Sequence, residues 1–180
     1  MARLPAFLRD RRGRDYSLVE LVAAGVILAT VLAVFLHQVR YYQEQAERSA
    51  VQSTVAALQS ALAMRAMGIL LMGNPDQIGR LEQENPMDWL AQQPSNYAGV
   101  FYGQPLERIP GGGWYFDRSG PALVYQVWRT GHFESGGAAK ADIHFRVIAE
   151  YGNLGPGTSA QGLKRLRIAP AEPYRWFDQG

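Results

Sequence analysis

The chain has 180 residues, and its 18 Lys and Arg nearly balance its 16 Asp and Glu. A net charge of +2 is too small to indicate a nucleic-acid-binding protein by itself. Because the sequence contains no cysteine, its composition excludes disulfide bonds, thiol catalysis and metal sites built on thiolates. The length corresponds to one domain of ordinary size, which we expect to bury its core without disulfides or metals.

Residues 1–15 form a short basic leader, in which Pro5 and Gly13 argue against a continuous helix. The leader is richer in arginine than the segment just beyond residue 36, where Arg40 and Arg48 are mixed with acidic residues. By the positive-inside rule, we expect a cytoplasmic N-terminus and a chain whose bulk lies on the other side of a membrane.

The apolar stretch over residues 16–36 predicts a transmembrane helix. Between residues 18 and 36 the only charged side chain is that of Glu20. These nineteen residues, at about 1.5 Å each, nearly span a hydrocarbon core of about 30 Å. No small-x-small cleavage site follows the stretch, so it is expected to stay as an anchor and not to be removed as a signal peptide.

Ser17 and Glu20 have the spacing of a capping box, in which each side chain accepts a hydrogen bond from an otherwise unpaired backbone N–H. This spacing predicts a helix that begins near Leu18. Residues 26–67 contain neither Gly nor Pro, so the helix is expected to continue as an amphipathic half over residues 37–70.

One face of the amphipathic half is predicted to be apolar, with spacings of four, three and four between its members: Val51, Val55, Leu58 and Leu62. The opposite face is predicted to carry Gln52, Gln59 and Ser60. An apolar helix face needs a partner surface, and we expect the rest of the chain to supply it.

The remainder of the chain predicts a connection followed by a sheet. Residues 71–98 read as a connecting region of short helical pieces between prolines. Aromatic and β-branched residues then predict strands near 99–103, 113–118, 122–130, 142–151 and 163–169. The Gly-rich links 110–113, 131–139 and 152–162 favour antiparallel hairpins. The predicted fold class is α+β, with a long N-terminal helix packed on an antiparallel sheet of about four strands within residues 99–180.

The six residues YSLVEL, 16–21, resemble the start of type IV pilin-like proteins, a family that includes pilins and the pseudopilins of type II secretion. That family opens with a basic leader, an aromatic residue and a short Ser/Thr-Leu-Ile/Val-Glu run at the head of an apolar helix. Segments 85–90 and 94–99, and the strand predicted from Trp114, are also similar to recurrent parts of such proteins. Without cysteine, the C-terminal disulfide loop of many pilins is excluded, which favours a pseudopilin.

The resemblance implies cleavage before Tyr16 by a prepilin peptidase and N-methylation of Tyr16. The family has Gly immediately before the cleavage point, where this chain has Asp15, so a processed and an uncleaved chain both stay open. The resemblance also implies that Glu20 contacts the N-terminus of a neighbouring pilin-like subunit, because a carboxylate in hydrocarbon is costly unless it is paired. A simpler interpretation makes Glu20 a helix cap alone.

The resemblance further implies a single-pass protein of the bacterial inner membrane, with a cytoplasmic N-terminus and a C-terminal domain in the periplasm or in a filament. We expect a structural subunit, of the minor class, in a pseudopilus or type IV pilus-like filament. Its expected partners are other pilin-like subunits and the membrane. Neither enzymatic activity nor a cofactor is expected.

A second hypothesis is a signal-anchored periplasmic module that binds DNA or a protein. It rests on a basic and aromatic C-terminal region: Lys164, Arg165, Arg167, Arg175, Trp176 and Phe177. Such a mixture suits single-stranded nucleic acid. Cations also protect an edge strand from self-pairing, and we expect the Lys and Arg side chains to have that role. We expect the tail after this strand to dock its aromatic side chains.

No catalytic or metal site is predicted. The three histidines, His37, His132 and His144, do not have the spacing of metal ligands. The acidic residues show no paired spacing typical of acid–base catalysis.

Overall fold

The computed structural model describes residues 17–105, 107, 109, 111–136, 141–153 and 161–177. The chain divides into two compact units, Met1–Tyr42 and Gln43–Gly180. Asp15 and Tyr16, the predicted cleavage junction with its methylation site, lie outside the described residues. Both remain predictions.

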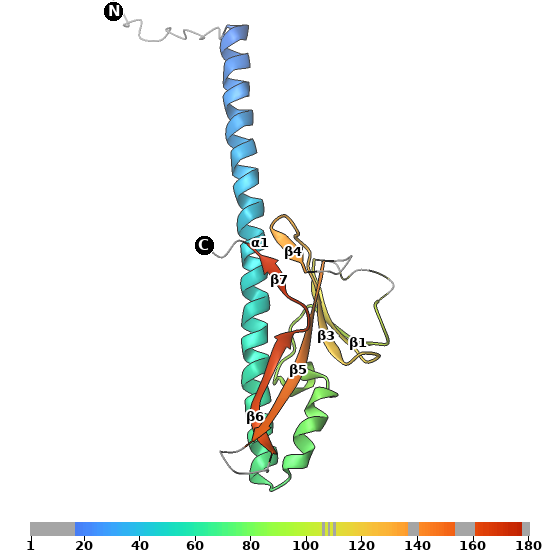
Figure 1. Cartoon of the computed structure of the whole chain (residues 1–180). Coiled ribbons are helices and arrows are strands. Elements are labelled where there is room, and N and C mark those ends of the chain that lie inside the picture. Colours follow the sequence, from blue (N-terminus) through green and yellow to red (C-terminus); the bar gives the residue numbers. More distant parts are fainter. Residues whose placement is uncertain are drawn as a thin grey trace, which may run out of the picture. The chain divides into compact units, whose positions relative to one another are not determined.

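A single helix, α1 (Leu18–Leu71), begins where the capping box places it (Figure 1). The Ser17 N–H donates to Oε2 of Glu20 at 3.1 Å, and the Val19 N–H donates to Oγ of Ser17 at 3.4 Å. By length and composition, this helix includes one stretch able to cross a membrane, and none of that stretch is buried. Leu18, for example, is 79% exposed.

The C-terminal unit contains a five-stranded sheet, in the order β1-β2-β3-β5-β6, and a two-stranded sheet of β4 and β7. Two 3-10 helices, η1 (Pro75–Glu82) and η2 (Pro86–Trp89), supply the short helical pieces predicted for the connection. The strand bounds are β1 (Tyr97–Phe101), β2 (Gly113–Asp117), β3 (Ala122–Gln126), β4 (Phe133–Ser135), β5 (Asp142–Asn153), β6 (Gln161–Pro170) and β7 (Tyr174–Trp176). Figure 1 shows these strands beside the C-terminal part of α1.

The predicted α+β class is confirmed, because the long helix packs against a mostly antiparallel sheet. The expected antiparallel sheet of about four strands is present as β2, β3, β5 and β6. The expectation of an antiparallel pair between the first two strands is wrong. The larger sheet has five strands, and β1 runs parallel to β2. A parallel neighbour needs a connection of about a dozen residues, and residues 102–112 are long enough to provide one. The predicted link 131–139 also contains β4, which pairs with β7 from the C-terminal tail.

Strand β3 ends at Gln126, before the predicted end at residue 130. Beyond this point the backbone finds other acceptors. The N–H groups of Trp128 and Arg129 donate to the carboxylate of Glu47 on α1, at 2.7 and 3.1 Å. The chain therefore leaves the sheet because a helix side chain replaces the neighbouring strand.

The predicted apolar face of α1 forms one wall of the core. Val51, Leu58 and Leu62 are almost fully buried, and Val55 packs against the same cluster. On the sheet side, the ring centroid of Trp114 lies 4.8 Å from that of Tyr125 and 5.7 Å from that of Phe145. Periodicity in the sequence was sufficient to find the helix side of this core.

Gln59, on the face predicted to be polar, hydrogen-bonds to the sheet. Its Oε1 accepts the N–H of Ile168 at 2.8 Å, and its Nε2 donates to the carbonyl of Leu166 at 3.3 Å. Both partners are in β6, at the edge of the larger sheet. An amide carries a donor and an acceptor, so Gln59 satisfies edge groups that would otherwise bond to water or to another strand.

Replacement of a core residue on α1 tests this packing. Leu58 is 0% exposed, and Leu58→Ala is expected to lower the free energy of unfolding by about 2–5 kcal/mol through lost burial and a residual cavity. Met64→Ala is the control, since Met64 lies on the same helix and is 71% exposed; a change below about 0.5 kcal/mol is expected. Urea unfolding of the full chain in detergent, followed by tryptophan fluorescence, measures both. Equal losses would contradict the assigned core.

Candidate functional site

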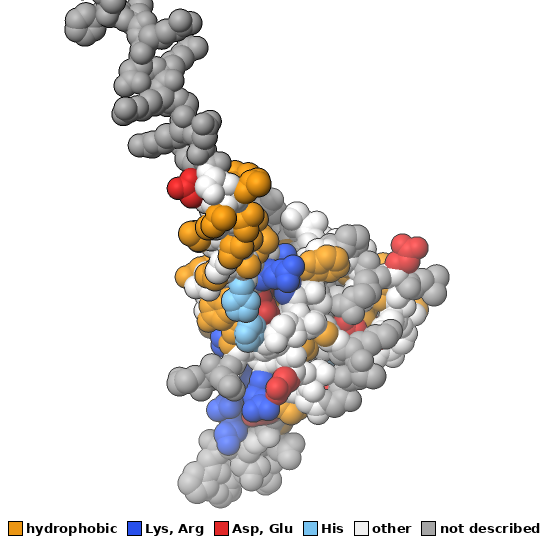
Figure 2. All heavy atoms as spheres, turned by 90° about the horizontal axis from the view of Figure 1, so that it is seen from above, with side chains coloured by type: hydrophobic (Ala, Val, Ile, Leu, Met, Phe, Trp, Pro, Cys, Tyr) orange, Lys and Arg blue, Asp and Glu red, His pale blue; other side chains and the backbone are white. Residues whose placement is uncertain are grey.

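Glu20 lies in the first turn of α1, among exposed apolar side chains. Its negative charge is favourable at the positive end of the helix dipole. Within the described residues, its carboxylate forms one hydrogen bond, from the Ser17 N–H. Figure 2 shows hydrophobic side chains gathered over the N-terminal part of α1. The carboxylate therefore stands on an apolar helix surface with capacity for a further partner.

The apolar surface around Glu20 is extensive. Residues 17–38 are all exposed, and the large side chains of Leu21 and Ile27 are 66% and 65% exposed. Exposed apolar surface of this extent marks a membrane or protein contact. In either environment a carboxylate is stabilised most by a cation.

A pair of carboxylates, Glu44 and Glu47, lies on α1 within the C-terminal unit; we call this pair the carboxylate clasp. Glu47 accepts three hydrogen bonds from residues 125–129. Besides the two backbone N–H groups that end β3, the hydroxyl of Tyr125 donates to its Oε1 at 3.0 Å. Glu47 thus binds the end of β3 to the helix.

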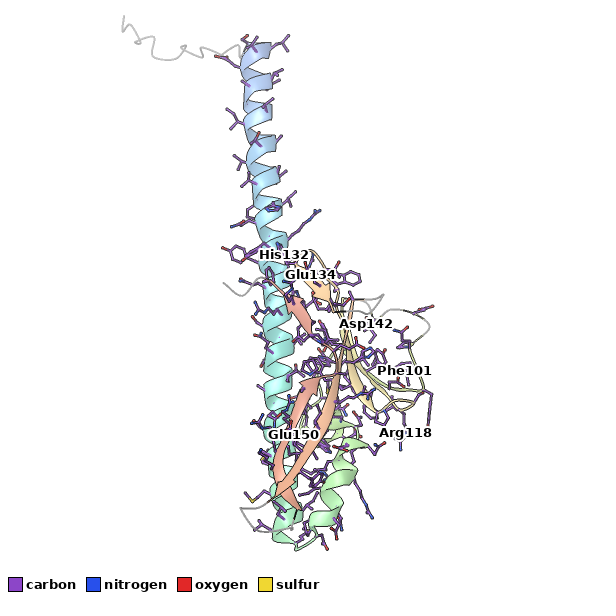
Figure 3. The ribbon with its side chains drawn as sticks, viewed as in Figure 1. Phe101, Arg118, His132, Glu134, Asp142 and Glu150 are labelled. Atoms are coloured by element: carbon purple, nitrogen blue, oxygen red, sulfur yellow. The ribbon has the colours of Figure 1, made fainter. Side chains whose placement is uncertain are left out.

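Glu44 is only 4% exposed and is fully engaged. Its Oε1 accepts the backbone N–H of His132 at 2.8 Å and the indole N–H of Trp176 at 3.2 Å. Its Oε2 lies 2.9 Å from Nδ1 of the same histidine, which Figure 3 labels beside α1. A buried carboxylate is tolerated when its lone pairs are satisfied in this way.

The clasp is the main feature that sequence reasoning missed. Glu44 and Glu47 were interpreted only as charges offsetting Arg40 and Arg48. Their positions held a signal, however, because Glu44 is seven residues before Val51 and Glu47 is four residues before it. Both therefore extend the apolar face of α1, and a carboxylate on such a face predicts a buried hydrogen-bonded contact.

The C-terminal cations and aromatic residues do not form one continuous basic surface. Arg167 pairs with Glu150 at 3.3 Å, and Arg175 pairs with Glu134 at 2.6 Å. Trp176 is buried in the core, as expected for a tail that docks its aromatic side chains. Lys164 and Arg165 are exposed on β6, which lies at a sheet edge as predicted.

The three histidines have different surroundings. His132 contacts Glu44 and stacks on Phe177, with ring centroids 4.7 Å apart and planes 16° apart. His37 is exposed on α1, and His144 pairs with Val124 between β5 and β3. The described part of the chain holds no group of three or more His, Asp and Glu side chains placed to bind a metal ion.

No protein-family model, curated protein or solved structure matches this chain. Inference about function therefore rests on the chain's own residues: the motif at the start of the apolar helix, the exposed surface around Glu20, and the domain that follows.

Loss of the buried carboxylate should be costly. Glu44→Ala removes the acceptor for the His132 and Trp176 donors, and we expect it to lower the free energy of unfolding by about 2–5 kcal/mol. Glu134→Ala is the matched control, because its ion pair with Arg175 is exposed; the expected loss is below about 1 kcal/mol. Chemical unfolding of both variants measures the difference. A similar small loss in both would show that the clasp does not hold the domain.

The tyrosines of the core predict alkaline sensitivity. Burial, and then the nearby charge of Glu47, raise the pKa of Tyr125 above its ordinary value of 10.0. Burial, with smaller contributions from Asp142 and Asp117, raises the pKa of Tyr115 to about 12. Above pH 10 the unfolded chain loses these protons first, so the folded state binds more protons and stability falls as the pH rises.

We expect unfolding free energy to be steady just below pH 10 and to decline above it, with a shallower decline in Tyr125→Phe. Parallel measurement of tyrosinate absorbance and chemical unfolding tests this. Ionisation of every tyrosine in the folded chain near pH 10, without loss of stability, would contradict the prediction.

Proposed function

We propose that the protein is a membrane-anchored structural subunit, of the minor class, in a pseudopilus or type IV pilus-like filament. The observation that carries the proposal is a single carboxylate, Glu20, in the first turn of an exposed apolar helix. The same helix, α1, continues without interruption to Leu71 and carries the domain's apolar docking face. The start motif at residues 16–21 supports the same family.

Assembly would bring the apolar segments of several subunits together. Bundling covers the exposed side chains of residues 18–36, while Glu20 pairs with the cationic N-terminus of a neighbouring subunit. An unpaired carboxylate in a membrane segment is costly, so pairing with a cation stabilises the assembled state. Because only one axial offset forms the pair, the contact also selects the register between helices.

The proposed location is the bacterial inner membrane, crossed once by α1, with the N-terminus in the cytoplasm. The arginine-rich leader supports this orientation. Prepilin peptidase and N-methylation of Tyr16 belong to the proposal only for a processed chain, and Asp15 at the junction leaves the uncleaved chain equally open.

The alternative, a signal-anchored periplasmic binding module, keeps one supporting observation: a pocket beside Arg48 in the C-terminal unit. DNA is the weaker ligand for such a module. Arg167 and Arg175 are already paired with carboxylates, which reduces the number of cations free to contact phosphates.

Substitution of Glu20 tests the proposal in native membranes. A photo-crosslinking residue in place of Ala23 reports on the neighbours of the apolar segment. We expect Glu20→Gln to reduce crosslinks to other subunits by about tenfold or more, because the charge pair is lost. The domain should remain folded, since Glu20 makes no contact with it in the proposal.

Glu107→Gln is the matched control for charge, because Glu107 is an exposed glutamate of the C-terminal unit. Crosslinking that is unchanged in Glu20→Gln would contradict assembly through this residue.

A further inference from the structure

A pocket of about 510 Å³ lies between α1 and β7. Three helix residues, Arg48, Val51 and Gln52, form one side, and the four consecutive residues 174–177 form the other. All belong to the C-terminal unit, and the volume is in the range of established ligand pockets. The described lining includes the consecutive residues of β7 and none of β4.

Among the described residues that line this pocket, Arg48 is the cation without an ion pair. Its side chain is partly buried, and its guanidinium carbon lies 5.9 Å from the ring centroid of Phe177. Its guanidinium forms no hydrogen bond or ion pair with any residue that the structure describes. A guanidinium carries five N–H donors in a planar fork that matches a carboxylate. Arg175, the other cation, is already paired with Glu134.

Phe177 holds an unusual backbone conformation at the pocket wall. Its φ of 61° is the only positive value at a non-glycine position among the described residues. A side chain in this left-handed region costs conformational energy and is often associated with functional sites. The turn ends β7 and places the Phe177 ring against both His132 and Arg48.

Among the described residues, β7 has a strand neighbour on one side only, which is β4. The Phe177 N–H donates to the His132 carbonyl at 2.9 Å, and the Gly136 N–H donates to the Pro173 carbonyl at 3.0 Å. Hydrogen-bonded pairs alternate with non-bonded pairs in an antiparallel ladder. Tyr174 and Trp176, which line the pocket, therefore direct their N–H and C=O groups away from β4.

We propose that this pocket binds an extended acidic segment of a partner protein, which adds as a strand to β7 while one of its carboxylates pairs with Arg48. An extended chain can form backbone hydrogen bonds with the N–H and C=O groups of Tyr174 and Trp176, as in other cases of strand addition. An acidic side chain matches this guanidinium, and none of the described residues that line the pocket carries a carboxylate. The site is independent of Glu20, so its failure and that of filament assembly are distinguishable.

A labelled peptide tests the proposal on the full chain in detergent micelles. The probe is a fluorescein-tagged peptide, Thr-Val-Glu-Val-Thr-Val, with blocked ends, and fluorescence polarisation measures its binding. We expect saturable binding that weakens about tenfold or more when Gln replaces the peptide's Glu, because a charge-assisted pair is lost. N-methylation of alternate backbone amides should abolish binding, since strand addition needs those donors.

Variants of the chain complete the test. Arg48→Gln should lower the affinity for the Glu peptide to that of the unchanged chain for the Gln peptide. The Arg48→Gln chain should bind the Gln peptide with this same affinity. The affinity of Arg48→Lys for the Glu peptide should lie between those of the unchanged chain and Arg48→Gln, because lysine keeps the charge and loses the planar fork. Arg118→Gln is the control, since Arg118 is exposed outside the pocket lining (Figure 3) and should leave binding unchanged.

Three results would each overturn the proposal: no saturable binding by the Glu peptide, equal binding by the Glu and Gln peptides, or unchanged binding in Arg48→Gln. Full binding by the N-methylated peptide, with displacement by free acetate, would identify a simple anion site in place of strand addition and would also overturn it. Tryptophan fluorescence of each variant confirms that the domain is folded.

Discussion

Hydrogen bonds from the sheet domain to Glu44 and Glu47 are the interaction on which the rest of the C-terminal unit depends. The chain leaves β3 after Gln126. Val127 still donates its backbone N–H to the Ala141 carbonyl at 2.9 Å, but the N–H groups that follow need other acceptors. The two carboxylates supply them, at residues 128, 129 and 132. This contact lets the chain turn into β4 while it remains attached to α1. It also holds Trp176, and with it β7, beside the helix.

Helix α1 carries two kinds of carboxylate. Glu20 is exposed on an apolar surface and has one hydrogen bond with the described residues, from its own turn. Glu44 is buried and accepts from two residues far away in the sequence. The first is available to a partner, whereas the second is used within the domain. The same helix thus combines a surface suited to assembly with the docking face of its domain.

Local signals in the sequence predicted the helix and half of the core. The capping box placed the start at Leu18, and the spacing of Val51, Leu58 and Leu62 identified the buried face. Strand segments were recognisable from aromatic and β-branched residues, and the antiparallel pairing expected between consecutive strands is found for β2-β3, β3-β5 and β5-β6. The parallel pairing of β1 with β2 and the sheet of β4 with β7 depend on contacts between distant residues. Gln59 and the clasp were missed because hydrophobic periodicity treats polar residues as solvent-facing.

The most direct measurement of the central claim is zero-length carbodiimide crosslinking in native membranes, followed by mass spectrometry. This chemistry joins a carboxylate to an amine only where the two are in contact. If α1 assembles as proposed, a peptide containing Glu20 will be linked to the N-terminal residue of a pilin-like subunit. Recovery of the Glu20 peptide without any such link, while other carboxylates in the same sample are crosslinked, would contradict assembly through Glu20.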